Sequence, residues 1–461
     1  MIKFGTDGWR AVIAEDFTFD NLKIVSQAIA DYLNKENKTK VIIGYDARFM
    51  SDLFAKTTAL VLAANNINVV LSRTIIPTPV ISLYAFKNKF DLGIMITASH
   101  NSAKFNGLKI KTQDGAAADK KLTDRIEKLL YKNKVRIITE EQATKKRLLK
   151  IESFENFYIN NLKNFINIEK IKKLKLKILI DLMYGAGNSF IEKVLANSGI
   201  KIDYLHNQFN PSFGGVSPEP IEDNLKEMAS IMRTKKYDLG IVLDGDADRI
   251  ATFDSRGNYI NAQVILPLLA IHMIKNRKEK KGIAKTVVGS NLIDEVALDL
   301  GVNCFETPVG FKYISVLFKE KLISIGGEEA GGIGFNGYIP ERDGSCAGLL
   351  ILEMMAQENK SFDELIDEIY KKYGRFFYKR CAISVDNVNK NLDDLKLPNS
   401  ILNKKIERIN RLDGIKLITK NNWLMLRKSG TEPIVRVYAE AKSEEEAERL
   451  LSVGKKIIYA L

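Results

Sequence analysis

Short apolar runs alternate with amphipathic stretches along most of the 461-residue chain. Residues 41–46 (Val-Ile-Ile-Gly-Tyr-Asp), 68–71 and 92–96 (Leu-Gly-Ile-Met-Ile) have the length and apolar content of buried strands. Residues 21–33 and 52–64 show the apolar spacing of helices. Strands that alternate with helices of this length predict a largely parallel, doubly wound sheet.

The same arrangement starts again near residue 150 and near residue 256. Residues 237–243 (Tyr-Asp-Leu-Gly-Ile-Val-Leu) repeat the pattern of residues 90–96 (Phe-Asp-Leu-Gly-Ile-Met-Ile), and both runs lead into a polar loop. Residues 322–325 form a third predicted strand, which ends in a polar, glycine-rich loop. We interpret these parts as three copies of one α/β unit. Three copies would place three different loops around one cleft.

The last part of the chain has a different pattern. Residues 423–426 and 434–439 are predicted strands, and Ser443 with Glu446 forms a capping box for a C-terminal helix. The predicted fold class is therefore α/β, with mainly parallel mixed sheets in three similar α/β/α domains and a smaller C-terminal α+β domain around a central cleft. The predicted domains are residues 1–150, 151–255 and 256–370 and, for the α+β domain, residues 371–461.

The composition is typical of a soluble globular protein, with 45% hydrophobic and 28% charged residues. The longest apolar stretch, residues 264–273, is too short to cross a bilayer, and the chain starts without a signal-peptide pattern. Cys304, Cys346 and Cys381 are far apart in the sequence, as expected for reduced cysteines. We therefore expect a cytoplasmic protein without a membrane partner.

The formal net charge of +13 is compatible with nucleic acid, a membrane surface or an anionic small molecule as partner. Much of the excess lies in lysine runs such as residues 170–177, where the alternation with apolar residues indicates a helix end followed by a half-exposed strand. The sequence has no basic motif interleaved with aromatic residues of the kind that single-strand binders use. The expected partner is an anionic small molecule, not nucleic acid.

The loop at residues 97–101 (Thr-Ala-Ser-His-Asn) directly follows the predicted strand 92–96. A buried strand that ends at small polar residues is how α/β proteins present reactive side chains at a sheet edge. Ser99 is therefore the candidate reactive residue; the alternative is that Ser99 and Asn101 only cap the next helix. The Asn-Gly pair at residues 106–107 predicts a hairpin turn.

Three carboxylates at a spacing of two residues, Asp244, Asp246 and Asp248, follow the second of the repeated strands. So much like charge in one place is costly unless a cation neutralises it, and oxygen ligands select Mg²⁺ or Ca²⁺. An EF-hand is excluded because its sixth and twelfth positions would be Arg249 and Ser255. The loop is either a divalent-metal site with Arg249 as a phosphate partner, or a solvated acidic turn.

Two further loops carry groups that can bind a sugar phosphate. Glu328 and Glu329 can accept hydrogen bonds from vicinal hydroxyls, although they could equally form a salt-bridged turn. A C-terminal loop combines a guanidinium, two hydroxyls and free amides, which suit the terminal oxygens of a phosphate. The residues of this loop are Arg427, Ser429, Gly430 and Thr431. An ordinary surface turn is the alternative for them.

Together, a serine at a strand end, a divalent-metal loop and a separate phosphate clamp favour phosphoryl transfer through a phosphoserine. The sequence resembles the α-D-phosphohexomutase superfamily, which contains the phosphoglucomutases and phosphomannomutases. Residues 97–101 resemble its phosphoserine loop, residues 244–249 its metal loop, residues 327–331 its sugar loop and residues 427–433 its phosphate loop. The four motifs occur in the family order over the whole chain.

The resemblance implies that Ser99 carries a phosphoryl group and that Mg²⁺ lies between this group and Asp244, Asp246 and Asp248. The phosphoryl group would pass to a hexose monophosphate, and the resulting hexose 1,6-bisphosphate would later return its other phosphate to Ser99. The implied activity is the interconversion of hexose 1-phosphate and hexose 6-phosphate, with glucose 1,6-bisphosphate as intermediate or activator. The enzyme would be a monomer or a homodimer.

The resemblance also implies roles for individual residues. Arg10, His100 and Lys109 would lie near the phosphoserine, with Lys109 as the preferred general base provided that its pKa is lowered. Glu328 would bind the sugar hydroxyls. The residues expected to contact the substrate are Arg249, Lys312, Glu328, Arg427, Ser429, Gly430, Thr431 and Arg436.

Two departures from the family pattern bear on the choice of sugar. Many relatives have Ser in place of Ala330, and many bacterial relatives of the mannose-tolerant and glucosamine types have His in place of Gly332. Residues 307–312 and the acidic pair Glu328 and Glu329 resemble those of phosphoglucomutase-type members. We therefore expect glucose phosphate as the favoured substrate, mannose phosphate second and glucosamine phosphate third.

A different enzyme class is also compatible with the metal loop. In a haloacid-dehalogenase-type phosphatase, Asp244 would be the nucleophile and Asp246 the acid. That interpretation leaves Ser99 and the C-terminal clamp without a role.

Overall fold

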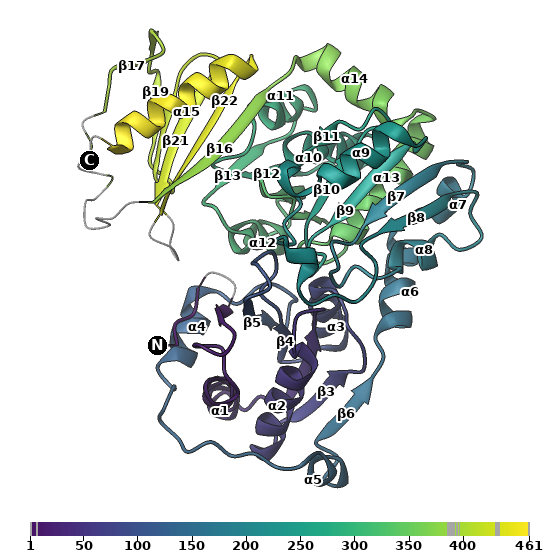
Figure 1. Cartoon of the computed structure of the whole chain (residues 1–461), viewed down its shortest axis with the longest axis vertical. Helices are drawn as coiled ribbons and strands as arrows, with labels where there is room; N and C mark the ends of the chain where they lie inside the picture. Colours follow the sequence, from purple (N-terminus) through teal and green to yellow (C-terminus); the bar gives the residue numbers. More distant parts are fainter. Residues whose placement is uncertain are drawn as a thin grey trace.

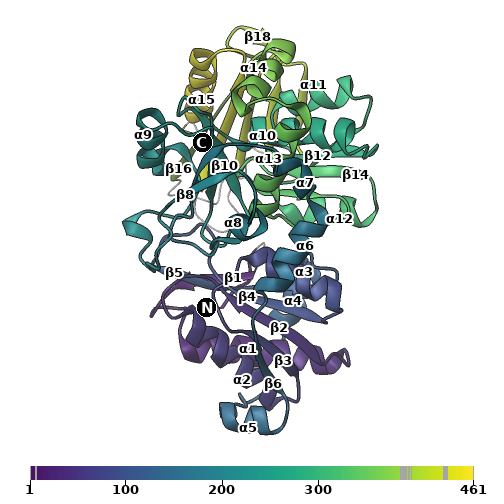
Figure 2. The same ribbon diagram turned by 90° about the vertical axis from the view of Figure 1, so that its right-hand side faces the viewer.

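The structure, a computed structural model, describes residues 2–5, 8–384, 392, 395, 397–428 and 434–459. Three α/β units follow one another along the chain, and a smaller domain with an antiparallel sheet ends it (Figure 1). The first unit lies at one end of the molecule in both Figure 1 and Figure 2. The C-terminal domain packs on the third unit through a cluster of apolar residues: Val287, Val288, Trp423, Met425 and Tyr438.

The first unit has a six-stranded mixed sheet in the order β1-β5-β4-β2-β3-β6. Its strands are β1 (Gly8–Val12), β2 (Lys40–Tyr45), β3 (Asn68–Ser72), β4 (Leu92–Ile96), β5 (Phe105–Thr112) and β6 (Leu149–Glu152). Its helices are α1 (Phe19–Lys35), α2 (Ser51–Ala64), α3 (Thr78–Asn88), α4 (Lys120–Glu127) and α5 (Glu140–Lys145). The structure therefore confirms the predicted elements 21–33, 41–46, 52–64, 68–71 and 92–96, which correspond to α1, β2, α2, β3 and β4.

The second unit has strands β7 (Lys177–Asp181), β8 (Lys201–Leu205), β9 (Leu239–Leu243), β10 (Ile250–Phe253) and β11 (Tyr259–Ile260), with helices α6 (Glu155–Phe165), α7 (Ile168–Ile171), α8 (Phe190–Val194) and α9 (Lys226–Thr234). The third unit has strands β12 (Gly282–Thr286), β13 (Cys304–Thr307), β14 (Ile323–Gly327) and β15 (Ile333–Phe335). The helices of this part of the chain are α10 (Ala262–Ile271), α11 (Asn291–Asp299), α12 (Phe311–Lys319), α13 (Gly344–Glu358) and α14 (Phe362–Tyr373). Within the described ranges, no helix is long and apolar enough to cross a membrane.

The three sheets share one strand order, which confirms the predicted internal repeat. In each sheet a parallel trio is extended by an antiparallel strand: β3-β2-β4-β5, β8-β7-β9-β10 and β13-β12-β14-β15. The third strand of each set, β4, β9 or β14, leads directly into one of the candidate loops. Because parallel strands end at the same edge of a sheet, the repeat brings a polar loop to the equivalent position in every unit.

The C-terminal domain has a five-stranded antiparallel sheet in the order β16-β22-β21-β20-β19. Its strands are β16 (Phe377–Ser384), β19 (Arg408–Asn410), β20 (Ile415–Ile418), β21 (Trp423–Lys428) and β22 (Ile434–Ala441), beside a small hairpin of β17 (Ser400–Ile401) and β18 (Lys404–Lys405). Helix α15 (Glu444–Tyr459) packs on this sheet. As half of the predicted capping box, Ser443 Oγ accepts the Glu446 N–H at 3.3 Å.

The second and third units share one hydrophobic core. Helix α13 follows the third sheet in the chain, yet it packs on β9 and β10 of the second sheet. Its apolar residues Leu349, Leu350 and Leu352 are fully buried. Because burying one leucine side chain contributes about 1.5–3 kcal/mol, this helix holds the two units firmly together.

Near Ser99 the structure excludes one alternative and contradicts one expectation. Ser99 does not cap a helix, because a turn and then β5 follow it. Asn106 and Gly107 do not form a hairpin turn but lie inside β5. Gly107 is needed there because a Cβ atom would lie 2.6 Å from the Thr97 carbonyl oxygen, and Asn106 Oδ1 accepts the Gly107 N–H at 2.8 Å. The connection between β4 and β5 is the Ser99 loop itself.

Candidate active site

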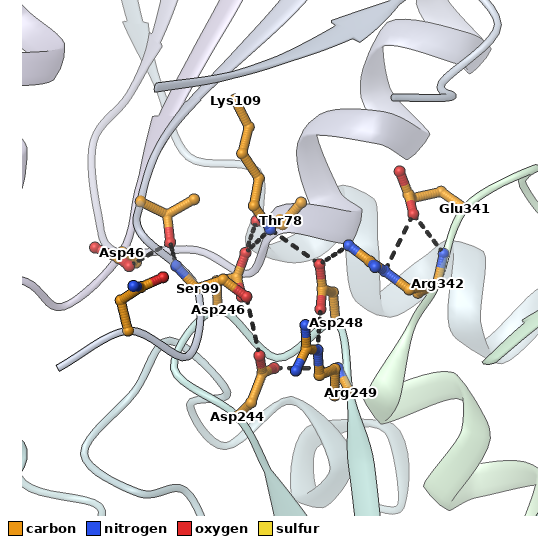
Figure 3. Close-up of polar contacts among 12 residues, drawn as sticks. Asp46, Thr78, Ser99, Lys109, Asp244, Asp246, Asp248, Arg249, Glu341 and Arg342 are labelled. Atoms are coloured by element: carbon orange, nitrogen blue, oxygen red, sulfur yellow. Dashed lines mark hydrogen bonds and ion pairs between the residues drawn. The ribbon is translucent and has the colours of Figure 1, made fainter. Parts of the chain in front are cut away.

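Ser99 lies in the turn after β4, where its backbone has a left-handed conformation with φ of 53°. A non-glycine residue in this conformation is uncommon and needs support from its surroundings. The Ser99 N–H donates to Thr97 Oγ1 at 2.8 Å, and the Thr97 hydroxyl donates to Asp46 Oδ2 at 2.6 Å. The Ser99 hydroxyl in turn donates to Asp244 Oδ2 in the second unit at 3.3 Å (Figure 3).

Arg48 holds the turn from the other side, and it is not among the residues expected from the sequence. Its terminal nitrogens donate to four carbonyl oxygens of the turn at 2.6–2.9 Å, namely those of Ser99, Asn101, Ser102 and Phe105. Asp46 neutralises the guanidinium at 3.2 Å, and both side chains are fully buried. The polar residues after β2 could have indicated Arg48, because β2 and β4 are parallel neighbours that end at the same sheet edge.

Asp244, Asp246 and Asp248 gather at the end of β9, and one oxygen of each lies within 4.8 Å of the others. All three are fully buried, which excludes the solvated acidic turn. Burial raises the pKa of Asp244 well above its ordinary value, and the charges of Asp246 and Asp248 add to this effect. Asp246 Oδ1 and Asp248 Oδ1 are buried without a hydrogen-bond partner among the described residues. These oxygens fit a divalent cation such as Mg²⁺.

Lys109, on β5, binds two of these carboxylates. Its Nζ lies 2.7 Å from Asp246 Oδ2 and 3.0 Å from Asp248 Oδ2 (Figure 3). Burial alone would lower the pKa of Lys109, but the two carboxylates outweigh it and raise the pKa. In this arrangement Lys109 is a buried positive charge beside the metal loop. Its role as general base stays a prediction.

His100 and Arg10 lie at the same place. Burial, together with the positive charges of Arg249, Arg10 and Lys109, holds the pKa of His100 well below its usual range. The His100 imidazole is therefore neutral, and its Nδ1 is buried with no hydrogen-bond partner in the described part of the chain. Arg10 Nη1 donates to Asn101 Oδ1 at 2.7 Å, which places a cation beside the Ser99 turn.

Thr78 and Arg249 also contact the three carboxylates. The Thr78 N–H, at the start of α3, donates to the Asp246 carbonyl oxygen at 3.0 Å, and the Thr78 hydroxyl donates to Asp246 Oδ2. The Arg249 N–H donates to Asp244 Oδ1 at 3.1 Å, and Arg249 Nε lies 3.9 Å from Asp248 Oδ1. The first unit thus clamps the metal loop through a helix N-terminus, where a negative group is favoured.

The third unit adds Glu328, whose carboxylate is bound by Arg342. Arg342 Nη1 donates to Glu328 Oε2 at 2.6 Å, and Arg342 Nη2 donates to Asp248 Oδ2 at 2.7 Å. The Ile250 N–H also donates to the Gly331 carbonyl oxygen at 3.0 Å, so the sugar loop pairs with the chain just after the metal loop. Arg342 was not expected from the sequence, and its position 14 residues after Glu328 offers no local signal.

The remaining expected residues belong to α12 of the third unit and to the C-terminal domain. Lys312 is half-buried at the start of α12, with Nζ 5.2 Å from the centre of the Tyr313 ring. Arg427 and Arg436 face each other in register across β21 and β22, and Arg427 Nε lies 2.8 Å from Asp413 Oδ2. Three other expected residues, Ser429, Gly430 and Thr431, lie outside the described residues.

Known protein families match the chain in four consecutive segments. Residues 1–136, 156–257 and 261–373 match the alpha/beta/alpha domains I, II and III of phosphoglucomutase/phosphomannomutase. Residues 382–452 match the C-terminal domain of the same family. Each of the four units of the fold contains most of one matched segment.

Individual relatives agree with this assignment but carry different sugar names. A phosphoglucosamine/phosphogalactosamine mutase of Sulfurisphaera tokodaii is 33% identical over 99% of this chain and 98% of its own length. A phosphoglucomutase/phosphomannomutase of Thermococcus kodakarensis is 31% identical over the same shares of the two chains. The crystal structure of a putative phosphomannomutase from Thermus thermophilus superimposes with a TM-score of 0.88 at 29% identity and covers 99% of both chains.

Proposed function

The chain belongs to the phosphoglucomutase/phosphomannomutase family of the α-D-phosphohexomutase superfamily, and we propose that it transfers a phosphoryl group through Ser99. It is a phosphohexomutase, an intramolecular phosphotransferase. The observation that carries the proposal is the Ser99 hydroxyl, 3.3 Å from Asp244 Oδ2 in a cluster of three buried carboxylates. A serine in this setting suits a phosphoryl carrier because a cation held by the carboxylates can screen its charge.

Asp244, Asp246 and Asp248 would hold Mg²⁺ together with Ser99. When bound there, Mg²⁺ would neutralise negative charge on the phosphoryl group during transfer. Lys109 keeps Asp246 and Asp248 in place, and Arg48 keeps the Ser99 turn in its left-handed conformation. These contacts orient the donor and the carboxylates before the substrate arrives, which lowers the cost of reaching the reactive geometry.

The proposed reaction has two symmetrical halves. In the first half, the bond between phosphorus and Ser99 Oγ breaks while the free hydroxyl of a hexose monophosphate bonds to phosphorus and loses its proton. The hexose 1,6-bisphosphate then turns over, and its other phosphate returns to Ser99. The expected general base is Lys109, which pairs with two carboxylates. A second candidate to accept the proton is His100, whose buried Nδ1 has no hydrogen-bond partner among the described residues. Arg10 supports the charge of the transferred group.

The distal phosphate would bind near Arg427 and Arg436. These two arginines lie directly opposite each other on neighbouring strands, and Arg427 also pairs with Asp413. Guanidinium groups bind phosphate oxygens through charge-assisted hydrogen bonds, so two of them side by side suit a phosphate. We propose that Lys312, Ser429, Gly430 and Thr431 belong to the same phosphate site and that Arg249 contacts the substrate near the metal loop.

Glucose phosphate is our proposed first substrate. Glu328 Oε2 is paired with Arg342, which leaves the other carboxylate oxygen to accept a hydrogen bond from a sugar hydroxyl. The relatives carry the names of phosphoglucosamine mutases and of a phosphoglucomutase/phosphomannomutase, so both other sugars are competitors. Our proposed order is glucose 1-phosphate first, mannose 1-phosphate second and glucosamine 1-phosphate third, as expected from the sequence.

Two measurements test the proposal. Intact-mass analysis of the purified protein should show a phosphoryl group that maps to Ser99 after incubation with glucose 1,6-bisphosphate. A coupled assay should then give the highest kcat/KM for glucose 1-phosphate among the three sugar phosphates. A higher value for glucosamine 1-phosphate would refute the sugar preference alone. Steady release of inorganic phosphate, undiminished in Ser99→Ala, would instead favour a phosphatase that uses Asp244.

A further inference from the structure

The Arg342 side chain occupies the space that a side chain at position 332 of the sugar loop would need. A Cβ atom at position 332 would lie 2.2 Å from Arg342 Cδ and 3.0 Å from Arg342 Cγ. Its next contact would be Glu328 Oε2 at 3.2 Å. The φ of Gly332 is not positive, so the backbone would accept another residue without strain. The Arg342 side chain is therefore what excludes a side chain from position 332.

Because its side chain packs against Gly332, the Arg342 guanidinium lies between the sugar loop and the metal loop. Arg342 is 3% exposed, and its guanidinium lies 5.6 Å from the centre of the Phe311 ring. One end of the guanidinium binds Glu328 of the sugar loop. The other end binds Asp248 of the metal loop (Figure 3). A planar, always charged fork of donors can satisfy two carboxylates at once, which a lysine ammonium does less well.

We propose that Arg342 is a positioning residue that uses the space left by Gly332 to orient Glu328 and to couple it to Asp248. This inference rests on the proposed function, in which Glu328 binds the sugar. A carboxylate held from one side by a guanidinium presents its other oxygen in a fixed direction. Because Asp248 shares the same guanidinium, a displacement of Arg342 disturbs both the sugar site and the metal site. Replacing a residue that orients a ligating group in this way typically lowers affinity or activity by about 10- to 100-fold.

The test is a double-mutant cycle of Gly332→Ala and Arg342→Ala. Gly332→Ala should raise the KM for glucose 1-phosphate about tenfold and shift the Mg²⁺ concentration for half-maximal activity upward. In the Arg342→Ala background the Cβ atom no longer meets an arginine, so Gly332→Ala should change KM less than about twofold. Equal effects of Gly332→Ala in the two backgrounds would overturn the proposal.

A binding measurement keeps the proposal testable if Arg342→Ala does not fold. Calorimetry on Ser99→Ala, with and without Gly332→Ala, should show about tenfold weaker binding of both glucose 6-phosphate and Mg²⁺ in the double variant. Unchanged affinity for both ligands refutes the role of Arg342, and a change for one ligand alone refutes the coupling. Lack of mutase activity in the wild-type protein would refute the proposed function instead, independently of these affinities.

Discussion

The Ser99 hydroxyl lies 3.3 Å from Asp244 Oδ2, although 145 residues separate the two in the sequence. The contact joins the ends of β4 and β9, which are equivalent strands in two copies of the repeat. A phosphorylated serine at this distance from three buried carboxylates requires a cation to offset their repulsion. Turnover should therefore depend on Ser99, on the cation and on the contacts that hold the two loops together.

Replacing Ser99 with alanine should abolish phosphoryl transfer. We expect kcat to fall at least about a thousandfold, because the Ser99 hydroxyl is the group of this turn that contacts Asp244 and is proposed to carry the phosphoryl group. The phosphorylated species should also disappear from the intact-mass spectrum. Ser102→Ala is the matched control, because Ser102 lies in the same turn and contacts Arg48 only through its backbone. Turnover by Ser99→Ala at the wild-type rate would rule out the phosphoserine route.

The sequence was sufficient for the strands and for the residues at their ends. Apolar runs such as residues 92–96 have few alternatives to a buried strand, so a polar loop after each run was a sound candidate for the site. The prediction of a hairpin turn from the Asn-Gly pair at 106–107 was wrong because it considered only local conformation. Gly107 is needed instead because the Thr97 carbonyl oxygen of a neighbouring segment leaves no room for a Cβ atom. Arg48 and Arg342 escaped prediction because their partners lie on other elements, which only the folded chain brings together.

Removal of divalent cations should stop turnover without unfolding the enzyme. Chelation should abolish activity, and added Mg²⁺ should restore it, because Asp246 Oδ1 and Asp248 Oδ1 are buried without a hydrogen-bond partner among the described residues and are left to bind a cation. Asp244→Asn should raise the Mg²⁺ concentration for half-maximal activity at least about tenfold. Asp223→Asn, at an exposed carboxylate of the second unit, should leave it unchanged. Full activity after chelation would contradict the metal site.

Replacing Arg48 should damage both stability and catalysis. Arg48→Met leaves the buried Asp46 carboxylate without its cation and four carbonyl oxygens without their donor, which should lower the free energy of unfolding by about 3–5 kcal/mol. Arg48→Lys keeps the charge but cannot reach all four carbonyls. We expect this variant to fold and to lose about a hundredfold in kcat, because the Ser99 turn is misplaced.

The measurements for Arg48 are urea unfolding and single-turnover phosphoryl transfer from glucose 1,6-bisphosphate. Arg73→Met is the control because Arg73 is an exposed arginine of the same unit. If Arg48→Lys transfers the phosphoryl group as fast as the wild type, the guanidinium is not needed to shape the turn.

Lys416 should make the stability of the C-terminal domain depend on pH. Its Nζ donates to the Val287 carbonyl oxygen at 2.6 Å, lies 3.2 Å from Glu306 Oε2 and sits 4.5 Å from the centre of the Trp423 ring. Burial lowers the pKa of Lys416 from 10.5 to about 8, which disfavours the charged form by about 3 kcal/mol. The folded protein therefore releases this proton at a lower pH than the unfolded chain, whose lysine pKa is about 10.4.

Because the folded state binds fewer protons between these two values, the contribution of Lys416 to stability should rise as the pH increases from about 8 to about 10. Below pH 8 the cost of burying the charge should be present in full. Lys416→Met removes the group, so the wild type should gain about 3 kcal/mol relative to this variant over that interval in urea titrations followed by Trp423 fluorescence in a Trp9→Phe background. The exposed Lys420→Met should follow the wild type at every pH. A constant difference between wild type and Lys416→Met across the interval would show that Lys416 keeps an ordinary pKa in the folded protein.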